Sequence, residues 1–400
     1  MMETANTKQR NLRTILYALD SAGEATAAHL AEQTGLSVAT ISRGLGFLKS
    51  KKLVIQRRKD TAEVGRRPDV FSINGAYAHC FYCRLYGDTI SGYLLDLSGK
   101  VVAKESVEAT ADMTVDAFLK KLLEMQQSLL EKKRSSGCIL TVTLAIPGLA
   151  DADGVISRIP NFPHFENVDL AAGVEKTLGH PCFIYNAARL SAVGAYLQNS
   201  DRVKSLVYMD ITGESGIGAG IVLDGKLYEG RAGEVGDMVI HADGDYRDHP
   251  ENQGALEREA GLGSVFQAAK ALLQAGSTPA LAQILQKQGK EVISLESLEK
   301  SAAEFDLDIY ELLSRTTKAW AAAIVNICAV LAPDEVVLGG AIHQGNKLIE
   351  KMVRHHLQHM YHRPISLQLA KKGAATHILG AAHLSGRFLL DMSLEDTQAE

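Results

Sequence analysis

Cysteine is scarce in this chain, whose 400 residues include only five, an odd number for a long sequence. So few thiols exclude a disulfide-rich secreted scaffold and favour a reducing compartment, so we expect a cytoplasmic protein. No apolar run approaches the roughly 20 residues of a membrane-spanning helix. The first ten residues are too polar for a secretion signal. We therefore expect no membrane partner.

Two of the thiols, Cys80 and Cys83, form a lone C-x-x-C motif within a segment that has the pattern of a strand. Positions three apart on a strand point to opposite faces of the sheet. The spacing therefore argues against joint metal binding by this pair.

Charge is divided unevenly along the chain. Residues 1–75 hold 12 Lys and Arg against 7 Asp and Glu, a net charge of +5. The remaining residues hold 30 against 40, a net charge of −10 that gives the total of −5. A basic head on an acidic body is typical of a nucleic-acid-binding module joined to a part that does not touch nucleic acid.

The basic head has the pattern of a winged helix-turn-helix. Thr26 can cap a short helix that ends near Gln33, and Gly35 supplies the turn. Ser37 can cap a second helix over residues 38–52. The length and spacing of these two helices predict a DNA-binding motif whose second helix enters the major groove.

The second helix is predicted to have two faces. Helical spacing places its apolar residues on one side: Val38, Ile41, Leu45 and Leu48. Short hydroxyls and one arginine face outward, as suits base edges and phosphates: Ser37, Ala39, Thr40, Ser42 and Arg43. Two glycines in the same helix, Gly44 and Gly46, suggest close packing or a tolerated loss of helix propensity.

A two-stranded wing is expected to follow, with residues 54–58 paired against residues 70–74. The loop between them carries Arg66 and Arg67, flanked by Gly65 and Pro68, and suits a minor groove. The alternative is a helical hairpin that binds protein instead of DNA.

Beyond Asn74 the pattern changes to strands alternating with helices, which predicts an α/β body. The expected strands are 80–86, 89–97, 138–145, 182–185, 205–211, 218–223 and 335–338, and the expected long helices are 115–132, 188–198 and 312–331.

The order and spacing of five short motifs in this body resemble the ROK family of repressors, uncharacterised reading frames and sugar kinases. The motifs are Ala145-Ile146-Pro147-Gly148, Pro160-Asn161-Phe162, Ile217-Gly218-Ala219-Gly220-Ile221-Val222, Gly233-Glu234-Val235-Gly236 and Val337-Leu338-Gly339-Gly340-Ala341. The resemblance implies a two-lobed actin-like, hexokinase-like ATPase fold behind the winged helix-turn-helix of residues 1–75. Residues 76–190, completed by a C-terminal helix at 380–400, would form the first lobe and residues 191–379 the second.

The resemblance also shows what kinase chemistry has been lost. The family's kinases cradle phosphate with an Asp-x-Gly-Gly-Thr turn, and the matching residues here include Arg84, Tyr86 and Asp88. Their catalytic base is the Asp of an Asn-Asp pair, and here that position is Ala187. Phosphoryl transfer needs both an oriented proton acceptor and a clamped phosphate. We therefore expect no catalytic residue, no enzyme activity and no cofactor.

The family's structural zinc is also expected to be absent. The segment that matches its cysteine cluster, residues 248–255, holds no cysteine, and the position of its histidine ligand is Asp237. Since zinc needs about four ligands, a different site would have to recruit His241, His249 and Asp248 with Asp237. Scattered surface polar residues are the simpler interpretation, so no metal is predicted.

Part of the family's sugar-binding cup survives. The resemblance assigns effector contacts to Asn161, Asn186, Glu234, Asp237 and Glu257. Two carboxylates and two amides directed at one cleft suit a polyol. Asp237 and Ala187 are changes from the family pattern, so the ligand can differ from a plain hexose. The alternative is that Glu234 and Glu257 are solvated surface acids.

Together these features predict a DNA-binding transcriptional regulator, a repressor by resemblance, whose catalytically dead body binds a carbohydrate or polyol effector. A homodimer, or a dimer of dimers, would hold a palindromic double-stranded operator. The first alternative is an active sugar kinase that carries a DNA-binding head. The second is a body that binds a partner protein in place of a small molecule.

Overall fold

The computed structural model of the chain describes residues 2–58, 69–132, 138–151, 154–159, 162–212, 216–230, 233–241, 254–289, 292–373 and 375–396. The chain divides into two compact units. The first is Met1–Tyr185 together with Ala381–Glu400, and the second is Asn186–Gly380. Within the described ranges, no helix is long and apolar enough to cross a membrane.

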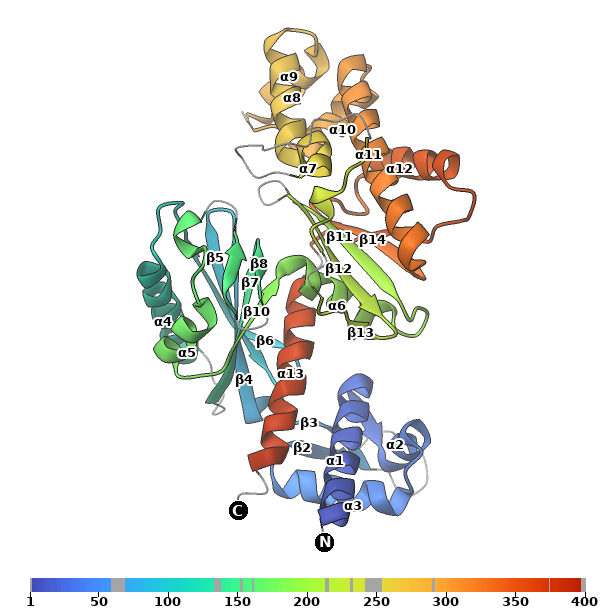
Figure 1. Cartoon of the computed structure of the whole chain (residues 1–400). Helices are drawn as coiled ribbons and strands as arrows, with labels where there is room; N and C mark the ends of the chain where they lie inside the picture. Colours follow the sequence, from blue (N-terminus) through green and yellow to red (C-terminus); the bar gives the residue numbers. More distant parts are fainter. Residues whose placement is uncertain are drawn as a thin grey trace. The chain divides into compact units, whose positions relative to one another are not determined.

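The first unit begins with three helices and a small sheet (Figure 1). The helices are α1 (Met2–Ala22), α2 (Ala27–Thr34) and α3 (Val38–Ser50). The strands are β1 (Glu24–Thr26), β2 (Val54–Arg58) and β3 (Asp69–Ile73), in the order β1-β3-β2 with antiparallel pairing throughout. The order of α2, α3, β2 and β3 is the predicted one, two helices followed by a two-stranded wing. Helix α1 and strand β1 were not predicted.

The predicted helix caps are confirmed. The side chain of Thr26 accepts a hydrogen bond from the backbone N–H of His29 (3.3 Å), and that of Ser37 accepts one from Thr40 (3.2 Å). Gly35 ends α2 with a φ of 70°, a left-handed conformation that glycine adopts without steric cost. The cap-turn-cap sequence therefore fixes where α3 begins.

The predicted apolar face of α3 is wrong at one position. Ile41, Leu45 and Leu48 are buried, but Val38 is 53% exposed. Val38 is the first residue of the helix, where its side chain projects beyond the helical core of the head. The helix also ends at Ser50, not Lys52, because Lys52 takes a left-handed φ of 64°. The second wing strand is shifted by one residue, to Asp69–Ile73.

The two glycines of α3 differ in their surroundings. A Cβ on Gly44 would lie 2.4 Å from Cδ1 of the buried Ile15 on α1, whereas a Cβ on Gly46 would meet no atom within 4 Å. Close packing therefore explains Gly44, while Gly46 has no steric reason to be glycine.

This contrast gives a matched pair of variants. Gly46→Ala is expected to raise the free energy of unfolding by up to about 1 kcal/mol, because alanine has the higher helix propensity. Gly44→Ala gains the same propensity but must overpack Ile15, so it should be less stable than Gly46→Ala by roughly 1–3 kcal/mol. Urea unfolding of both variants measures the difference. Equal stability of the two would contradict the packing of α1 against α3.

The remainder of the first unit is a five-stranded sheet of order β10-β7-β4-β5-β6. Its strands are β4 (Ala78–Tyr86), β5 (Thr89–Asp96), β6 (Val101–Glu108), β7 (Cys138–Ile146) and β10 (Cys182–Asn186). A cluster around Phe118 and Phe165 packs α4 (Val115–Lys132) and α5 (Leu170–Leu178) on one face. The short elements are η1 (Gly75–Tyr77), η2 (Pro163–Phe165) and the hairpin of β8 (Leu149–Ala150) and β9 (Ile156–Arg158).

The long helix α13 (Thr376–Asp396) packs on the other face of this sheet. The thiol of Cys80 donates to Ser385 Oγ (3.2 Å), and the Phe388 ring meets Phe183 edge to face at 4.5 Å. Cys83 instead belongs to the cluster under α4. The two thiols therefore lie on opposite faces, as the spacing predicts, and burial raises the pKa of both.

The second unit contains another five-stranded sheet, of order β13-β12-β11-β14-β15. Its strands are β11 (Leu206–Ile211), β12 (Ile217–Leu223), β13 (Lys226–Leu227), β14 (Glu335–Gly340) and β15 (Leu367–Leu369). One face packs on α11 (Leu307–Leu331) and α12 (Lys347–Met360), and the other packs on α6 (Ala187–Asn199).

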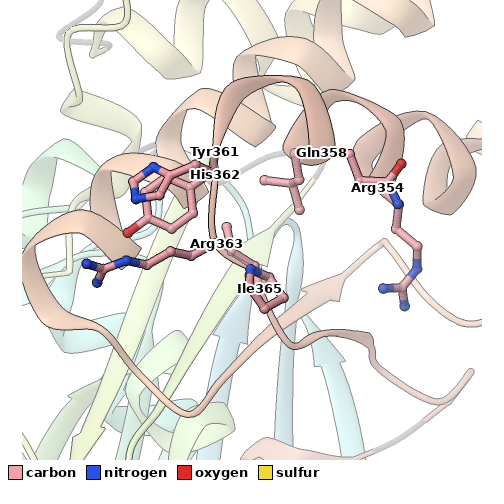
Figure 2. Close-up of a pocket in the computed structure, with 8 residues that line it drawn as sticks. Arg354, Gln358, Tyr361, His362, Arg363 and Ile365 are labelled. Carbon is pink, nitrogen blue, oxygen red and sulfur yellow. The ribbon is translucent and has the colours of Figure 1, made fainter.

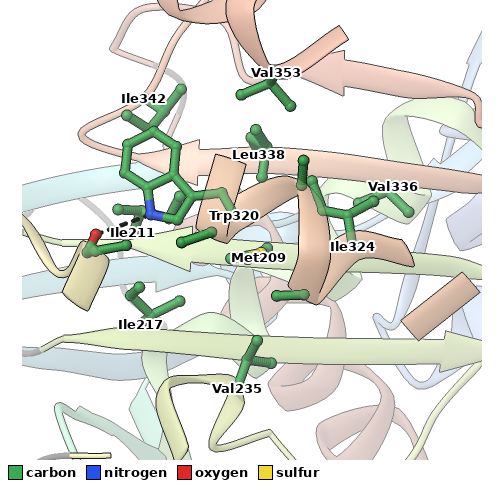
Figure 3. Packing of buried hydrophobic residues seen from close by; sticks show 14 of the residues in the cluster. Met209, Ile211, Ile217, Val235, Trp320, Ile324, Val336, Leu338, Ile342 and Val353 are labelled. Atoms are coloured by element: carbon green, nitrogen blue, oxygen red, sulfur yellow. Dashed lines mark hydrogen bonds between the residues drawn. The ribbon is translucent and has the colours of Figure 1, made fainter. Parts of the chain in front are cut away.

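Trp320 occupies the centre of the core under α11 (Figure 3). It is fully buried, and its indole Nε1–H donates to the backbone carbonyl of Ala260 (2.9 Å). This bond satisfies the polar atom of a large apolar side chain and ties α11 to a helical extension. The extension is η3 (Val235–Asp237), α7 (Ala255–Ala260), α8 (Leu262–Gln274), α9 (Pro279–Gln288) and α10 (Leu295–Ala303).

Candidate functional site

The outer surface of α3 presents most of the residues predicted to read DNA. Ser37, Ala39, Ser42 and Arg43 are exposed. Thr40 is half-buried, and its hydroxyl lies 2.9 Å from that of Ser37, so it also belongs to the helix cap. The predicted wing residues Arg66 and Arg67 lie outside the described residues.

Two further residues on this surface are not in the predicted set. Val38 is exposed beside Ser37, and its methyl groups suit the C5-methyl group of thymine. Lys49 Nζ donates to Gln56 Oε1 on β2 (2.5 Å), which links α3 to the wing. The only signal in the sequence for the exposure of Val38 is its place at the first position of the helix, where an apolar side chain has little to pack against.

In the second unit, Asn186 holds the start of α6. Its side-chain Oδ1 accepts from the N–H of Ala188 (2.8 Å), which makes it the N-cap of that helix. A Cβ on Gly218 would lie 3.8 Å from this Oδ1 and 3.8 Å from the carbonyl of Gly233. The side chain of Asn186, at the end of β10, therefore lies close to the beginning of β12 and to the segment that carries Glu234.

Glu257 lies on α7, next to the first residues of β12. Its half-buried carboxylate lies against two backbone segments: a Cβ on Gly216 would be 2.1 Å from its Oε2, and one on Gly236 would be 2.8 Å away. The carboxylate therefore lies close to the backbone of two glycines beside the first residues of β12. Its role as an effector contact stays a prediction.

Glu234 and Asp237 bracket the short helix η3 and are both exposed. Asp237 packs against Gly254, where a Cβ would be 2.2 Å from its Oδ1. The N–H of Leu256 donates to the carbonyl of Met238 (3.1 Å), which joins this segment to α7. Four of the five predicted effector residues are thus gathered around the first residues of β12, and Asn161 lies outside the described residues.

The phosphate turn expected from the kinases is occupied by its own side chains. At the end of β4, before the turn to β5, the guanidinium of Arg84 lies over the Tyr86 ring, 4.4 Å from its centre. Asp88 accepts from the Thr89 hydroxyl (3.0 Å), and its carbonyl accepts from the N–H of Ala109 (2.6 Å). Gly87 is the one glycine of this turn, and the ring of Tyr86 stands where the family's phosphate turn has a second glycine.

At the base position, Ala187 is the first residue of α6 and is buried, with only a methyl group to present. Of the residues named for a recruited metal site, His241 pairs with Glu259 at 3.0 Å, while Asp248 and His249 lie outside the described residues. Among the residues the structure describes, no group of three or more His, Cys, Asp or Glu side chains could hold a metal ion.

A separate pocket of about 280 Å³ lies at the end of α12 (Figure 2). Arg354, His362 and Arg363 contribute to its lining. Arg354 already donates to Glu350 (2.9 Å) and to the carbonyl of Leu367 (2.9 Å). None of the predicted effector residues lines this pocket.

Comparison with known proteins identifies the class. The fold is that of two-lobed actin-like, hexokinase-like proteins. The model of the ROK family matches residues 84–387, so the chain belongs to the ROK family.

Three known proteins illustrate the likeness. The xylose repressor of Bacillus subtilis is 27% identical over 251 residues, which cover 59% of this chain and 62% of that protein. The crystal structure of a ROK family transcriptional regulator, described as a homologue of the Escherichia coli Mlc protein, has a TM-score of 0.77. It is 24% identical and covers 97% of this chain and 99% of its own. A ROK family glucokinase from Streptomyces griseus has a TM-score of 0.62 at 20% identity, covering 77% of this chain and 99% of its own.

Proposed function

We propose that this protein is a sugar-responsive transcriptional repressor that binds DNA through residues 1–75 and a carbohydrate or related polyol beside β12. The proposal rests on one observation: the body lacks the catalytic base of the family's kinases but keeps residues that are predicted to bind the sugar. The base position is Ala187, yet Glu257 is still held in a niche formed by two glycines. A body that binds a ligand but cannot convert it suits a protein that senses that ligand. The names of the relatives support repression and make xylose the first ligand to test.

The DNA-binding part of the proposal rests on the surface of α3 and on charge. The head has a net charge of +5, and Arg43 is exposed among short polar residues near the start of a helix. Such a helix docks in the major groove with its first turns toward the bases. We propose that a homodimer, or a dimer of dimers, presents two heads to a palindromic operator.

Coupling between the two parts is proposed to run through α6 and α13. A Cβ on Gly194 of α6 would be 1.9 Å from the carbonyl of Thr376, and one on Gly380 of α13 would be 1.9 Å from the carbonyl of Leu190. The two helix backbones are therefore in direct contact, with no side chain between them. A ligand that displaces the Asn186 cap of α6 would act on α13 through this crossing.

The far end of α13 holds the first helix of the head. Asp391 pairs with Arg13 (2.6 Å) and accepts from the Tyr17 hydroxyl (2.7 Å), while Arg387 lies over the Tyr17 ring at 4.9 Å. Burial, followed by the bond to Asp391, raises the pKa of Tyr17 to about 12, so the phenol remains a donor throughout the physiological range. A shift of α13 would thus be transmitted to α1 and to α3, which packs on it.

We propose that the body has no kinase activity and uses neither a metal nor a nucleotide cofactor. Purified protein with ATP, magnesium and a panel of sugars should release no ADP above background in a coupled assay. The matched variant is Ala187→Asp, which restores a carboxylate but leaves Arg84 and Tyr86 in the phosphate turn. It should also be inactive. Sugar-dependent ADP release by the wild type would refute the proposal and favour a kinase with a DNA-binding head.

A further inference from the structure

A second pocket in the same unit differs in chemistry from the predicted effector site. It has a volume of about 200 Å³ and is lined by the last turns of α6 and by residues of strands β11, β14 and β15. At about 30 Å³ per water, this space equals roughly six or seven waters, enough for a molecule of monosaccharide size. Four side-chain amides and two cations line it: Gln198, Asn199, Gln344, Gln368, Arg202 and Lys371.

The floor of the pocket is buried and polar. Tyr208 and Thr376 are 3% and 4% exposed and both line it. Burial raises the pKa of Tyr208 to about 12, so its hydroxyl stays protonated. Gly339 is required here, because a Cβ would lie 1.8 Å from that hydroxyl oxygen. The polar floor is therefore fixed in place by its backbone surroundings.

Glu335 does not line the pocket, but it is bonded to Gln368, which does. It is 3% exposed, and its Oε2 accepts from Nε2 of Gln368 (2.5 Å). Within the described part of the chain, its other oxygen, Oε1, has no hydrogen-bond partner. Burial raises the pKa of this carboxyl, and the positive charge of Arg202 opposes that rise. A buried carboxyl oxygen without a partner is costly, and the bond to Gln368 connects this carboxyl to the lining of the pocket.

The charge of the lining selects the class of ligand. The pocket is lined by two cations and no carboxylate, whereas the effector residues beside β12 include Glu234, Asp237 and Glu257. Arginine and lysine at a rim recognise phosphate or carboxylate through charge-assisted bonds, and amides bond to hydroxyls. The pocket therefore favours an anionic ligand, which the carboxylates beside β12 would repel.

We propose that this pocket binds a small polyhydroxylated anion, a sugar phosphate or a sugar acid, as a second ligand independent of the one beside β12. The pocket is lined by Ala195 of α6 and by Thr376, the first residue of α13. An occupant would contact both helices at the point where their backbones cross. The anion would therefore act on the same pair of helices as the first ligand.

Binding of glucose 6-phosphate, gluconate, glucose and inorganic phosphate to the full-length protein tests this site by calorimetry. We expect glucose 6-phosphate or gluconate, or both, to bind at least tenfold more tightly than glucose or inorganic phosphate. The double variant Arg202→Ala/Lys371→Ala should weaken that binding at least tenfold. Both side chains are exposed, so the ligand-free variant should remain folded, with only a small loss of thermal stability from the missing positive charge near Glu335. Binding by only one anion would identify the charged group as phosphate or carboxylate.

Two control variants separate this site from its neighbours. Lys372→Ala removes an exposed cation next to the pocket that does not line it, and it should bind the anion as the wild type does. Glu257→Gln alters the site beside β12 and should also leave anion binding unchanged. Anion binding that survives the double variant, or that is lost in Glu257→Gln, would overturn the proposal. So would equal affinity for inorganic phosphate, or no binding by either anion at millimolar concentration.

Discussion

Arg43→Ala should weaken operator binding by roughly 1–3 kcal/mol, a loss of about 5- to 150-fold in affinity. Arg43 is the one exposed cation in the first two turns of α3, so its guanidinium is placed to reach a guanine edge or a phosphate. The measurement is a fluorescence-anisotropy titration of a duplex selected from a random pool, at several salt concentrations. A base contact would relax sequence preference at one position. A phosphate contact would instead lower the salt dependence.

Arg10→Ala is the matched control for this experiment. It removes the same charge from the head, but from an exposed position on α1. If the two variants lose the same affinity, only the net charge of the head matters, and the assignment of α3 as the recognition helix is wrong.

Glu257→Ala should reduce effector binding by roughly 1.5–3 kcal/mol, the range for hydrogen bonds to a charged group. The carboxylate is held against Gly216 and Gly236, so it is positioned before the ligand arrives. A thermal-shift screen of sugars, sugar phosphates and polyols, beginning with xylose, identifies the ligand, and calorimetry then measures the loss.

Glu259→Ala serves as the control, because Glu259 is an exposed acid on the same helix α7. Its carboxylate pairs with His241, so it should have little effect on the ligand. Equal binding by wild type and Glu257→Ala would place the effector elsewhere.

Local signals in the sequence predicted much of the head and the body. Thr26, Gly35 and Ser37 specify caps and a turn that depend only on neighbouring residues, and the structure has all three. The unalternating run 138–145 corresponds to β7, and residues 115–132 form α4 as expected. These elements are set by short-range chemistry and by the period of their apolar residues.

Features that depend on distant contacts were not predictable in this way. Helix α1 was missed because its first ten residues are polar, although its later residues pack in the core of the head. Val38 follows the helical period yet is exposed, because no other element covers it. The niche of Glu257 depends on Gly216 and Gly236, which only the fold brings to it.

The pocket lined by Arg202 and Lys371 was also not predictable from the sequence. Its cations, Arg202 and Lys371, are separated by most of the second unit in sequence, and no short motif connects them. The sequence places Glu335 at the start of the strand 335–338, but only the strand pairing shows that it lies on the face of the sheet that packs on α6. Family resemblance predicted the site beside β12 because its residues follow motifs, whereas no motif marks this pocket.

The central claim is that a ligand beside β12 changes the affinity of the head for DNA. The direct measurement is operator binding by the full-length protein with and without saturating ligand. The account predicts a change of about 5- to 150-fold, equivalent to about 1–3 kcal/mol of coupling. In Asp391→Ala, which removes the partner of Arg13 and Tyr17, the ligand should bind normally but the change should be smaller. An operator affinity that is the same with and without bound ligand in the wild type would contradict the account.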